Sequence, residues 1–187
     1  MRQKKIIDII IPALGAVFIS VCSWVSIPIT VPFTLQTFAV FCVLLLFGAK
    51  SGILSIITYI AVGAIGAPVF SNFTSGIGVI FGATGGYILG FILIGIIYWL
   101  FTSLIKNSTL FRIISLIIGL FFFYSFGTLW FYAVYTKSNG PIGLVSVLMW
   151  CVVPFILPDL LKLTVAVFIF KRLAPIIKKY MKRDCNV

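Results

Sequence analysis

The sequence has 187 residues, of which 62% are hydrophobic and only 9% are charged, and its mean hydropathy is +1.26. These values exclude a water-soluble globular protein of this length and indicate an integral membrane protein. The net charge is +11, but the basic residues cluster at the ends of apolar segments and form no patch with interleaved aromatic residues, so no nucleic-acid partner is expected. The chain has room for a single membrane domain over residues 1–187, surrounded by the lipid bilayer.

Apolar segments predict membrane helices at 6–26, 35–49, 51–66, 83–105 and 111–135. The first segment has a basic start like that of a signal peptide, but it is too long and lacks a clear cleavage site, so we interpret it as a membrane helix. Residues 141–170 would span about 45 Å as one helix, which is too long for one crossing and too short for two. Because Pro154 and Pro158 disfavour helix before them, the run is predicted to split into a short interfacial helix over 141–153 and a last crossing over 159–177.

The predicted fold class is therefore all-α, with six transmembrane helices and both termini on one side of the membrane. Among the basic residues in loops and at helix ends, only Lys137 falls on the side of the membrane opposite the termini. The others share the side of the termini: Arg2, Lys4, Lys5, Lys50, Lys106, Arg112, Lys171, Arg172, Lys178, Lys179, Lys182 and Arg183. The positive-inside rule then predicts that both termini are cytoplasmic. The loops at 27–34, 67–82 and 136–158 are expected outside, so that Asp159 begins the last helix at the outer face.

Asp159 and Lys162 are two charged residues in an otherwise apolar segment, three positions apart and on one face of the predicted helix. In the first turn of a helix a carboxylate is favoured by roughly 0.3–1 kcal/mol through the helix dipole. One interpretation is a mutual ion pair that only lowers the cost of membrane insertion. The other is a polar clamp for a ligand, since ionisable residues within membrane segments are functional candidates.

Two further stretches supply polar groups on the predicted outer side. Gln36 enters the second helix and needs a partner, either a carbonyl of a neighbouring helix or a ligand. The glycine-rich stretch 66–87 carries Phe70, Ser71, Asn72 and Tyr87 and lacks the lysine of a phosphate loop. It is either a loop that closely approaches a small ligand or an ordinary connection. Most aromatic residues here are expected in the interface belt or in packing, with one or two in a pocket wall.

Ala16 and Ser20 form a small-xxx-small pair on the first helix, which permits close approach of another helix. The partner is either another helix of this chain or a second protein. The chain has no histidine, no paired carboxylates and no Walker motif, so catalytic, metal and ATP sites are not expected. The four cysteines lack metal-ligand or disulfide spacing and are interpreted as small buried hydrophobic residues: Cys22, Cys42, Cys151 and Cys185.

Four strings in order resemble one family, the biotin-transporter S components (BioY) of energy-coupling factor (ECF) transporters. They are "IPITVPFTLQTFAV" at 27–40, "GAIGAPVF" at 63–70, "GATGGYILGF" at 82–91 and "PFILPDLLKLTVA" at 154–166, and the match runs from about Ala13 to Arg172. The resemblance implies a six-helix protein of a prokaryotic cell membrane that captures biotin at its outer face. It also implies a transmembrane coupling protein and two cytoplasmic ATPases as partners. This sequence departs from the family's Ala-xxx-Ala face at Ser20, a residue that is also small.

The resemblance implies a substrate site for biotin, the transported ligand, and no cofactor. Asp159 is expected to accept from the ureido N–H groups, and Lys162 to meet the ureido carbonyl or to balance the charge of Asp159. Asn72 with its loop neighbours Phe70 and Ser71, together with Tyr87 and Gln36, would complete the site, while Ala16 and Ser20 would face the coupling protein. Alternatives are an S component for another small vitamin, a stand-alone secondary transporter or, least supported, an intramembrane enzyme.

Overall fold

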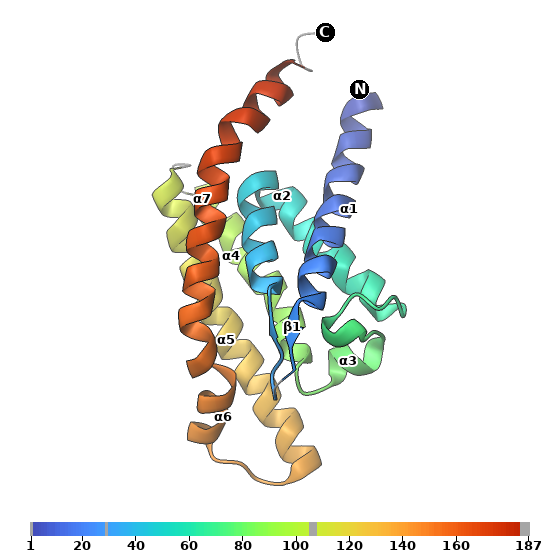
Figure 1. Cartoon of the computed structure of the whole chain (residues 1–187), viewed down its shortest axis with the longest axis vertical. Coiled ribbons are helices and arrows are strands. Elements are labelled where there is room, and N and C mark those ends of the chain that lie inside the picture. Colours follow the sequence, from blue (N-terminus) through green and yellow to red (C-terminus); the bar gives the residue numbers. More distant parts are fainter. Residues whose placement is uncertain (1, 29, 105–107, 184–187) are drawn as a thin grey trace.

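The computed structural model describes residues 2–28, 30–104 and 108–183, and the side chains of 6–28, 30–104 and 108–176. The long helices are α1 (Arg2–Trp24), α2 (Gln36–Ala64), α4 (Gly85–Leu104), α5 (Thr109–Asn139) and α7 (Val153–Arg183). Shorter elements are β1 (Ser26–Ile27), β2 (Phe33–Thr34), the 3₁₀ turn η1 (Ser71–Phe73), α3 (Ile77–Phe81) and α6 (Leu144–Cys151). The chain is thus a helical bundle with one small antiparallel ribbon, in which Ser26 pairs with Thr34 (Figure 1).

Five described helical stretches are long and apolar enough to cross a membrane: Ile6–Trp24, Gln36–Ala64, Gly85–Leu104, Thr109–Asn139 and Leu144–Ile176. A helix satisfies its own backbone hydrogen bonds, which is the condition for crossing hydrocarbon. Large apolar side chains also cover the outside of the bundle, among them Ile9 at 70%, Phe121 at 68% and Leu161 at 61% exposure. The all-helical membrane protein expected from composition is confirmed, and the start of α1 and the end of α7 lie at the same end of the bundle (Figure 1).

Helix α2 contains a sharp turn at Gly48, where φ is 80° and ψ is 173°. A Cβ added at Gly52 would lie 3.0 Å from the Cα of Leu44 on the other side of this turn. In a straight helix two residues eight positions apart are separated by about 12 Å. The legs 36–47 and 49–64 therefore fold back on each other, as Figure 1 shows. The segments predicted at 35–49 and 51–66 correspond to these two legs.

The last helix begins earlier than the sequence predicted. The chain breaks at Val152, which ends α6 with φ −123° and ψ −57°, and α7 starts at Val153. Pro154 then occupies the first turn, where the backbone N–H has no helical acceptor in any case, and Pro158 lies inside the helix. The prediction that Pro158 starts a span over 159–177 is wrong. Asp159 lies in the second turn of α7, where the helix dipole favours a carboxylate less than in the first.

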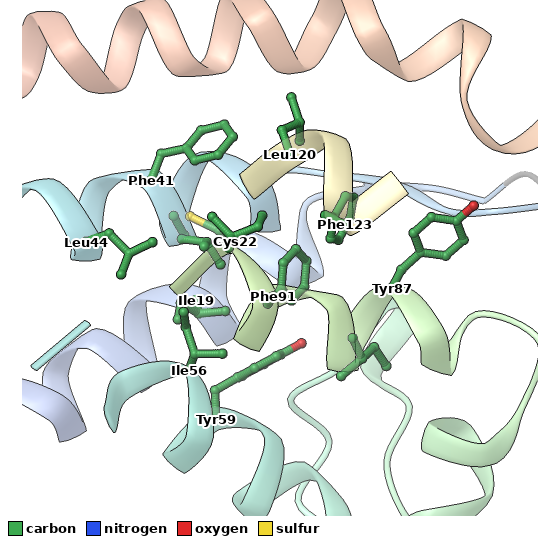
Figure 2. Close-up of a cluster of buried hydrophobic side chains, with 14 of the residues drawn as sticks. Ile19, Cys22, Phe41, Leu44, Ile56, Tyr59, Tyr87, Phe91, Leu120 and Phe123 are labelled. Atoms are coloured by element: carbon green, nitrogen blue, oxygen red, sulfur yellow. The ribbon is translucent and has the colours of Figure 1, made fainter. Parts of the chain in front are cut away.

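The core of the bundle joins α1, both legs of α2, α4 and α5. Ile19, Leu44, Ile56, Ile94 and Leu116 are all fully buried in it. Figure 2 shows side chains of this cluster meeting from these helices. Helix α7 packs against α2 and α6 at the side of this core. The cysteines at 22, 42 and 151 are buried and free, which confirms their interpretation as small core residues, whereas Cys185 lies outside the described part of the chain.

Replacing Gly48 with alanine is expected to lower the free energy of unfolding by about 1–3 kcal/mol, because this backbone conformation is essentially restricted to glycine. No atom lies within 4 Å of the new Cβ, so the loss would report backbone strain alone. Gly78→Ala is the matched control, since its Cβ also meets open space and its φ is not positive. Unfolding in detergent measures both variants, and equal stability would contradict the strained turn.

Candidate functional site

A small cavity lies where the start of α2 meets α4, α5, α6 and α7. Its volume is about 50 Å³. The lining residues are Val31, Pro32, Thr34, Gln36, Thr37, Tyr87, Phe91, Phe123, Tyr124, Cys151, Phe155, Asp159 and Lys162. Four residues predicted for the substrate site, Gln36, Tyr87, Asp159 and Lys162, are therefore brought together here from three helices.

Asp159 and Lys162 form a buried ion pair on the α7 wall of the cavity. Lys162 Nζ donates to Asp159 Oδ1 over 2.8 Å. The side chain of Lys162 is 9% exposed and that of Asp159 is 2% exposed. They lie three residues apart on α7, so the helix itself places both groups on one face. Such a pair must have its remaining hydrogen-bonding groups satisfied, because each buried charge has lost its water.

The ammonium of Lys162 has all three of its donors engaged. Besides Asp159, it donates to the carbonyl oxygen of Thr34 over 2.6 Å and to Thr37 Oγ1 over 3.1 Å. It also lies 4.3 Å from the centroid of the Phe33 ring, at a distance suited to a cation–π contact. The β2 strand and the first turn of α2 thus hold this cation against α7, although 125 residues separate Thr37 from Lys162.

The carboxylate of Asp159 accepts three hydrogen bonds and keeps capacity for more. Oδ1 accepts from Lys162 and from Thr37 Oγ1 over 2.8 Å, and Oδ2 accepts from Tyr124 Oη over 2.5 Å. A carboxylate offers about four acceptor positions, so one remains on Oδ2. The site therefore presents a buried carboxylate oxygen with an open acceptor position, which suits a ligand with an N–H donor.

Aromatic rings form the apolar wall of the cavity. The Phe91 and Phe123 rings stack with centroids 5.1 Å apart, and Tyr87 lies 5.5 Å from Phe123 (Figure 2). The Tyr87 hydroxyl pairs with Thr128 Oγ1 over 3.0 Å. A Cβ at Gly127 would come within 2.3 Å of the Tyr87 ring, so only glycine leaves room for this ring against α5. The wall suits a flat apolar part of a ligand.

Gln36 finds its partners within the protein. Its amide nitrogen donates to the Tyr59 hydroxyl, and its amide oxygen accepts from Thr34 Oγ1 over 3.0 Å. Tyr59 is fully buried and meets the ring of Phe70 edge-on, with centroids 5.5 Å apart. The predicted need for a partner is thus met by a tyrosine of the second leg of α2, in place of a backbone carbonyl.

Phe70, Ser71 and Asn72 do not line the cavity. Phe70 is fully buried behind Tyr59, and Asn72 Oδ1 accepts from Ser26 Oγ over 2.9 Å. The same loop is tied to the end of α1, where Trp24 Nε1 donates to the carbonyl of Pro68 over 2.8 Å. Direct ligand contact by Phe70, Ser71 and Asn72 stays a prediction.

Four lining residues that belong to apolar runs with many aromatic residues were not predicted from the sequence: Phe91, Phe123, Tyr124 and Phe155. The three phenylalanines carry no sequence signal, and Tyr124 differs from its phenylalanine neighbours only by its hydroxyl. The hydroxyl in "FFFYSF" is the one available signal, because a buried tyrosine hydroxyl needs a partner. Among the described residues no group of three or more His, Cys, Asp or Glu side chains is arranged to hold a metal ion.

Ala16 and Ser20 lie on the α1 side of a separate groove against the second leg of α2. Both residues are buried, at 6% and 7% exposure, and Ser20 Oγ donates to the Ala16 carbonyl over 2.8 Å. The groove has a volume of about 300 Å³ and is also lined by Val17 and Val62. The pair thus packs within the bundle and at the same time borders a groove.

An apolar helical bundle with a cavity around a buried ion pair defines an integral membrane protein with an internal cavity. The family model described as "BioY family" matches residues 1–179. The biotin transporter BioY of Thermotoga maritima is 40% identical over 158 residues, which is 83% of this chain and 88% of that protein. The probable biotin transporter BioY of Pyrococcus horikoshii is 35% identical over 167 residues, 89% of this chain and 95% of that one.

A solved structure has the same fold. It is a crystal structure of the S-component for biotin from an ECF-type ABC transporter, with a TM-score of 0.76, 26% sequence identity and coverage of 94% of each chain. The chain belongs to the BioY family, and the resemblance drawn from the four sequence strings is confirmed.

Removing one member of the ion pair is expected to destabilise the protein more than removing both. Lys162→Met or Asp159→Leu alone leaves an uncompensated buried charge and should cost about 3–5 kcal/mol of unfolding free energy. The double variant should recover most of this loss. Tyr124→Phe, which removes one hydrogen bond to the carboxylate, should cost about 1.5–3 kcal/mol. Unfolding of ligand-free protein in detergent measures the cycle, and strictly additive losses would refute the coupling.

Proposed function

We propose that this protein is the biotin-binding S component of an ECF-type importer. The family match and the biotin transporters among its relatives support this function. The observation that carries it is the buried carboxylate of Asp159 in an aromatic cavity. The chain is a transporter subunit and not an enzyme. ATP hydrolysis belongs to its partners, a transmembrane coupling protein and two cytoplasmic ATPases.

The chemistry of biotin fits the groups around the cavity. The ureido ring has two N–H donors, one of which suits the single free acceptor position of Asp159 Oδ2. The apolar thiophane ring suits the wall of Phe91 and Phe123. Because the three donors of Lys162 are already engaged, its role is to balance the charge of Asp159. A direct bond from Lys162 to the ureido carbonyl would first require loss of one of these contacts.

The cavity must widen when a vitamin enters it. Its volume is about 50 Å³, whereas pockets for small organic ligands are typically about 300–1,000 Å³. We infer that the bound state differs from this one in the positions of the wall side chains. The loop residues Phe70, Ser71 and Asn72 are proposed to approach the ligand in that state. In this one Phe70 lies against Tyr59, and Asn72 is bonded to Ser26.

The topology proposed for the chain has six crossings. Helices α1, α4, α5 and α7 give four, and the two legs of α2 are proposed to give the others because the chain reverses at Gly48. The legs are only about 18 and 24 Å long, so the flanking segments 30–35 and 65–67 are proposed to complete these two crossings. An even number of crossings agrees with the common end of α1 and α7 (Figure 1). The positive-inside rule places that end in the cytoplasm of a multi-pass cell-membrane protein, with α6 at the outer interface.

The purified protein is expected to bind biotin, and Asp159→Asn is expected to weaken binding about 10- to 100-fold. The reason is that a hydrogen bond to a charged acceptor contributes about 1.5–3 kcal/mol. Asp8→Asn is the matched control, because it removes the same charge from an exposed position on α1 outside the cavity. Equilibrium titration with labelled biotin in detergent measures both variants.

Three outcomes would argue against the proposed function. Saturable binding of riboflavin or thiamin, and not biotin, would indicate an S component for another vitamin. Uptake into vesicles without any ATPase, abolished by an uncoupler, would indicate a secondary transporter. An equal loss of biotin affinity in Asp8→Asn and Asp159→Asn would contradict direct contact between biotin and the carboxylate of Asp159.

The coupling protein is proposed to dock along the groove bordered by Ala16 and Ser20. Ser20→Leu should fill the groove and lower co-purification with the coupling protein and ATPases by about tenfold or more, while biotin binding is retained. Ser138→Leu, the same change at an exposed position of α5, should have no effect on co-purification. If Ser20→Leu co-purified with the coupling protein as well as the unaltered protein does, Ala16 and Ser20 would have a role only in packing within the bundle.

A further inference from the structure

A second cavity lies at the end of the bundle that holds the start of α1 and the end of α7. It has a volume of about 540 Å³ and lies between the turn of α2, the first turns of α5 and the later part of α7. Its lining includes Leu46, Phe47, Arg112, Phe170 and Lys171. None of the described lining residues is shared with the cavity around Asp159. Lys171 follows Lys162 by nine positions, which is about 14 Å along a helix.

Among the residues that the structure describes, this cavity is lined by two charged side chains, Arg112 and Lys171, and by no acidic one. The chain has only three acidic residues: Asp159 is paired with Lys162 in the other cavity, Asp8 is on α1, and Asp184 is outside the described part. The protein thus concentrates positive charge here with no carboxylate among the described lining residues.

The side chains around the two cations would suit an amphiphilic anion. The Arg112 guanidinium lies 5.1 Å from the centroid of the Phe170 ring, which fixes it between α5 and α7. A guanidinium binds phosphate oxygens in pairs, and an ammonium adds a second point charge. Leu46, Phe47 and Phe170 provide apolar surface beside these charges. The start of α5 at Thr109, which also lines the cavity, adds the partial positive charge of a helix N-terminus.

We propose that this cavity binds the phosphate headgroup of an anionic phospholipid, whose acyl chains follow the apolar residues beside it. A free phosphate ion has the same charge chemistry, but it would leave the apolar part of the lining unused. The cavity lies at the end of membrane-crossing helices, where headgroups are located. A bound lipid would connect the turn of α2 with α5 and α7, three segments that are far apart in the sequence.

The test compares binding of dioleoyl phosphatidylglycerol and dioleoyl phosphatidylcholine to delipidated protein in detergent, by native mass spectrometry. The anionic lipid is expected to bind about tenfold more tightly, since each basic residue near a headgroup contributes about 1 kcal/mol. Arg112→Gln should abolish most of this preference. Lys50→Gln is the matched control, because it removes one positive charge from an exposed residue near the same turn of α2 that does not line the cavity, and it should leave the preference within about twofold.

Lys171→Gln provides a second variant at an exposed position, in case Arg112→Gln impairs folding. Retained biotin binding in each variant shows that the bundle is intact, and it also separates this proposal from the proposed function, because the two cavities share no described lining residue. An equal loss in Lys50→Gln would overturn the proposal in favour of diffuse charge attraction. Inorganic phosphate that competes as strongly as the lipid would overturn it in favour of a soluble anion, and unchanged lipid preference in both cavity variants would overturn it outright.

Discussion

The burial of Asp159 and Lys162 between apolar helices is the constraint on which the site depends. An ion pair in such surroundings is tolerated only if every donor and nearly every acceptor finds a partner. Lys162 obtains its partners from β2 and the first turn of α2, and Asp159 from α2 and α5. The pair therefore fixes α7 against segments that lie up to 128 residues away in the sequence.

The shape of the cavity follows from how these partners are held. Thr34 and Thr37 reach the pair because the β1–β2 ribbon delivers the chain directly into α2. On the opposite side, Gly127 lets the Tyr87 ring lie against α5, and Phe123 stacks on Phe91. One side of the cavity is thus polar, with one acceptor position open on Asp159, and the other is flat and apolar. The proposed orientation of biotin uses this division.

The two cavities of the bundle differ in the charges of the residues that line them. Around Asp159 the positive and negative groups balance each other inside the chain. Around Arg112 and Lys171 the described lining residues include no carboxylate. A protein with only three acidic residues among 187 has few carboxylates to place beside its basic side chains. In the lipid proposal, an anionic headgroup from the membrane adds negative charge at this end of the bundle.

Composition and apolar periodicity determined the membrane class and the approximate helix positions, because a chain in hydrocarbon must be apolar and must satisfy its own backbone. Because charged residues are rare in the apolar segments, the sequence also marked Asp159 and Lys162 as candidates for a functional site. The tertiary structure alone decided that α7 begins at Val153, that Tyr124 and Thr37 complete the ion pair, and that Phe70 packs behind Tyr59. These features depend on contacts between distant segments and on a proline tolerated inside a helix, and neither leaves a local pattern in the sequence.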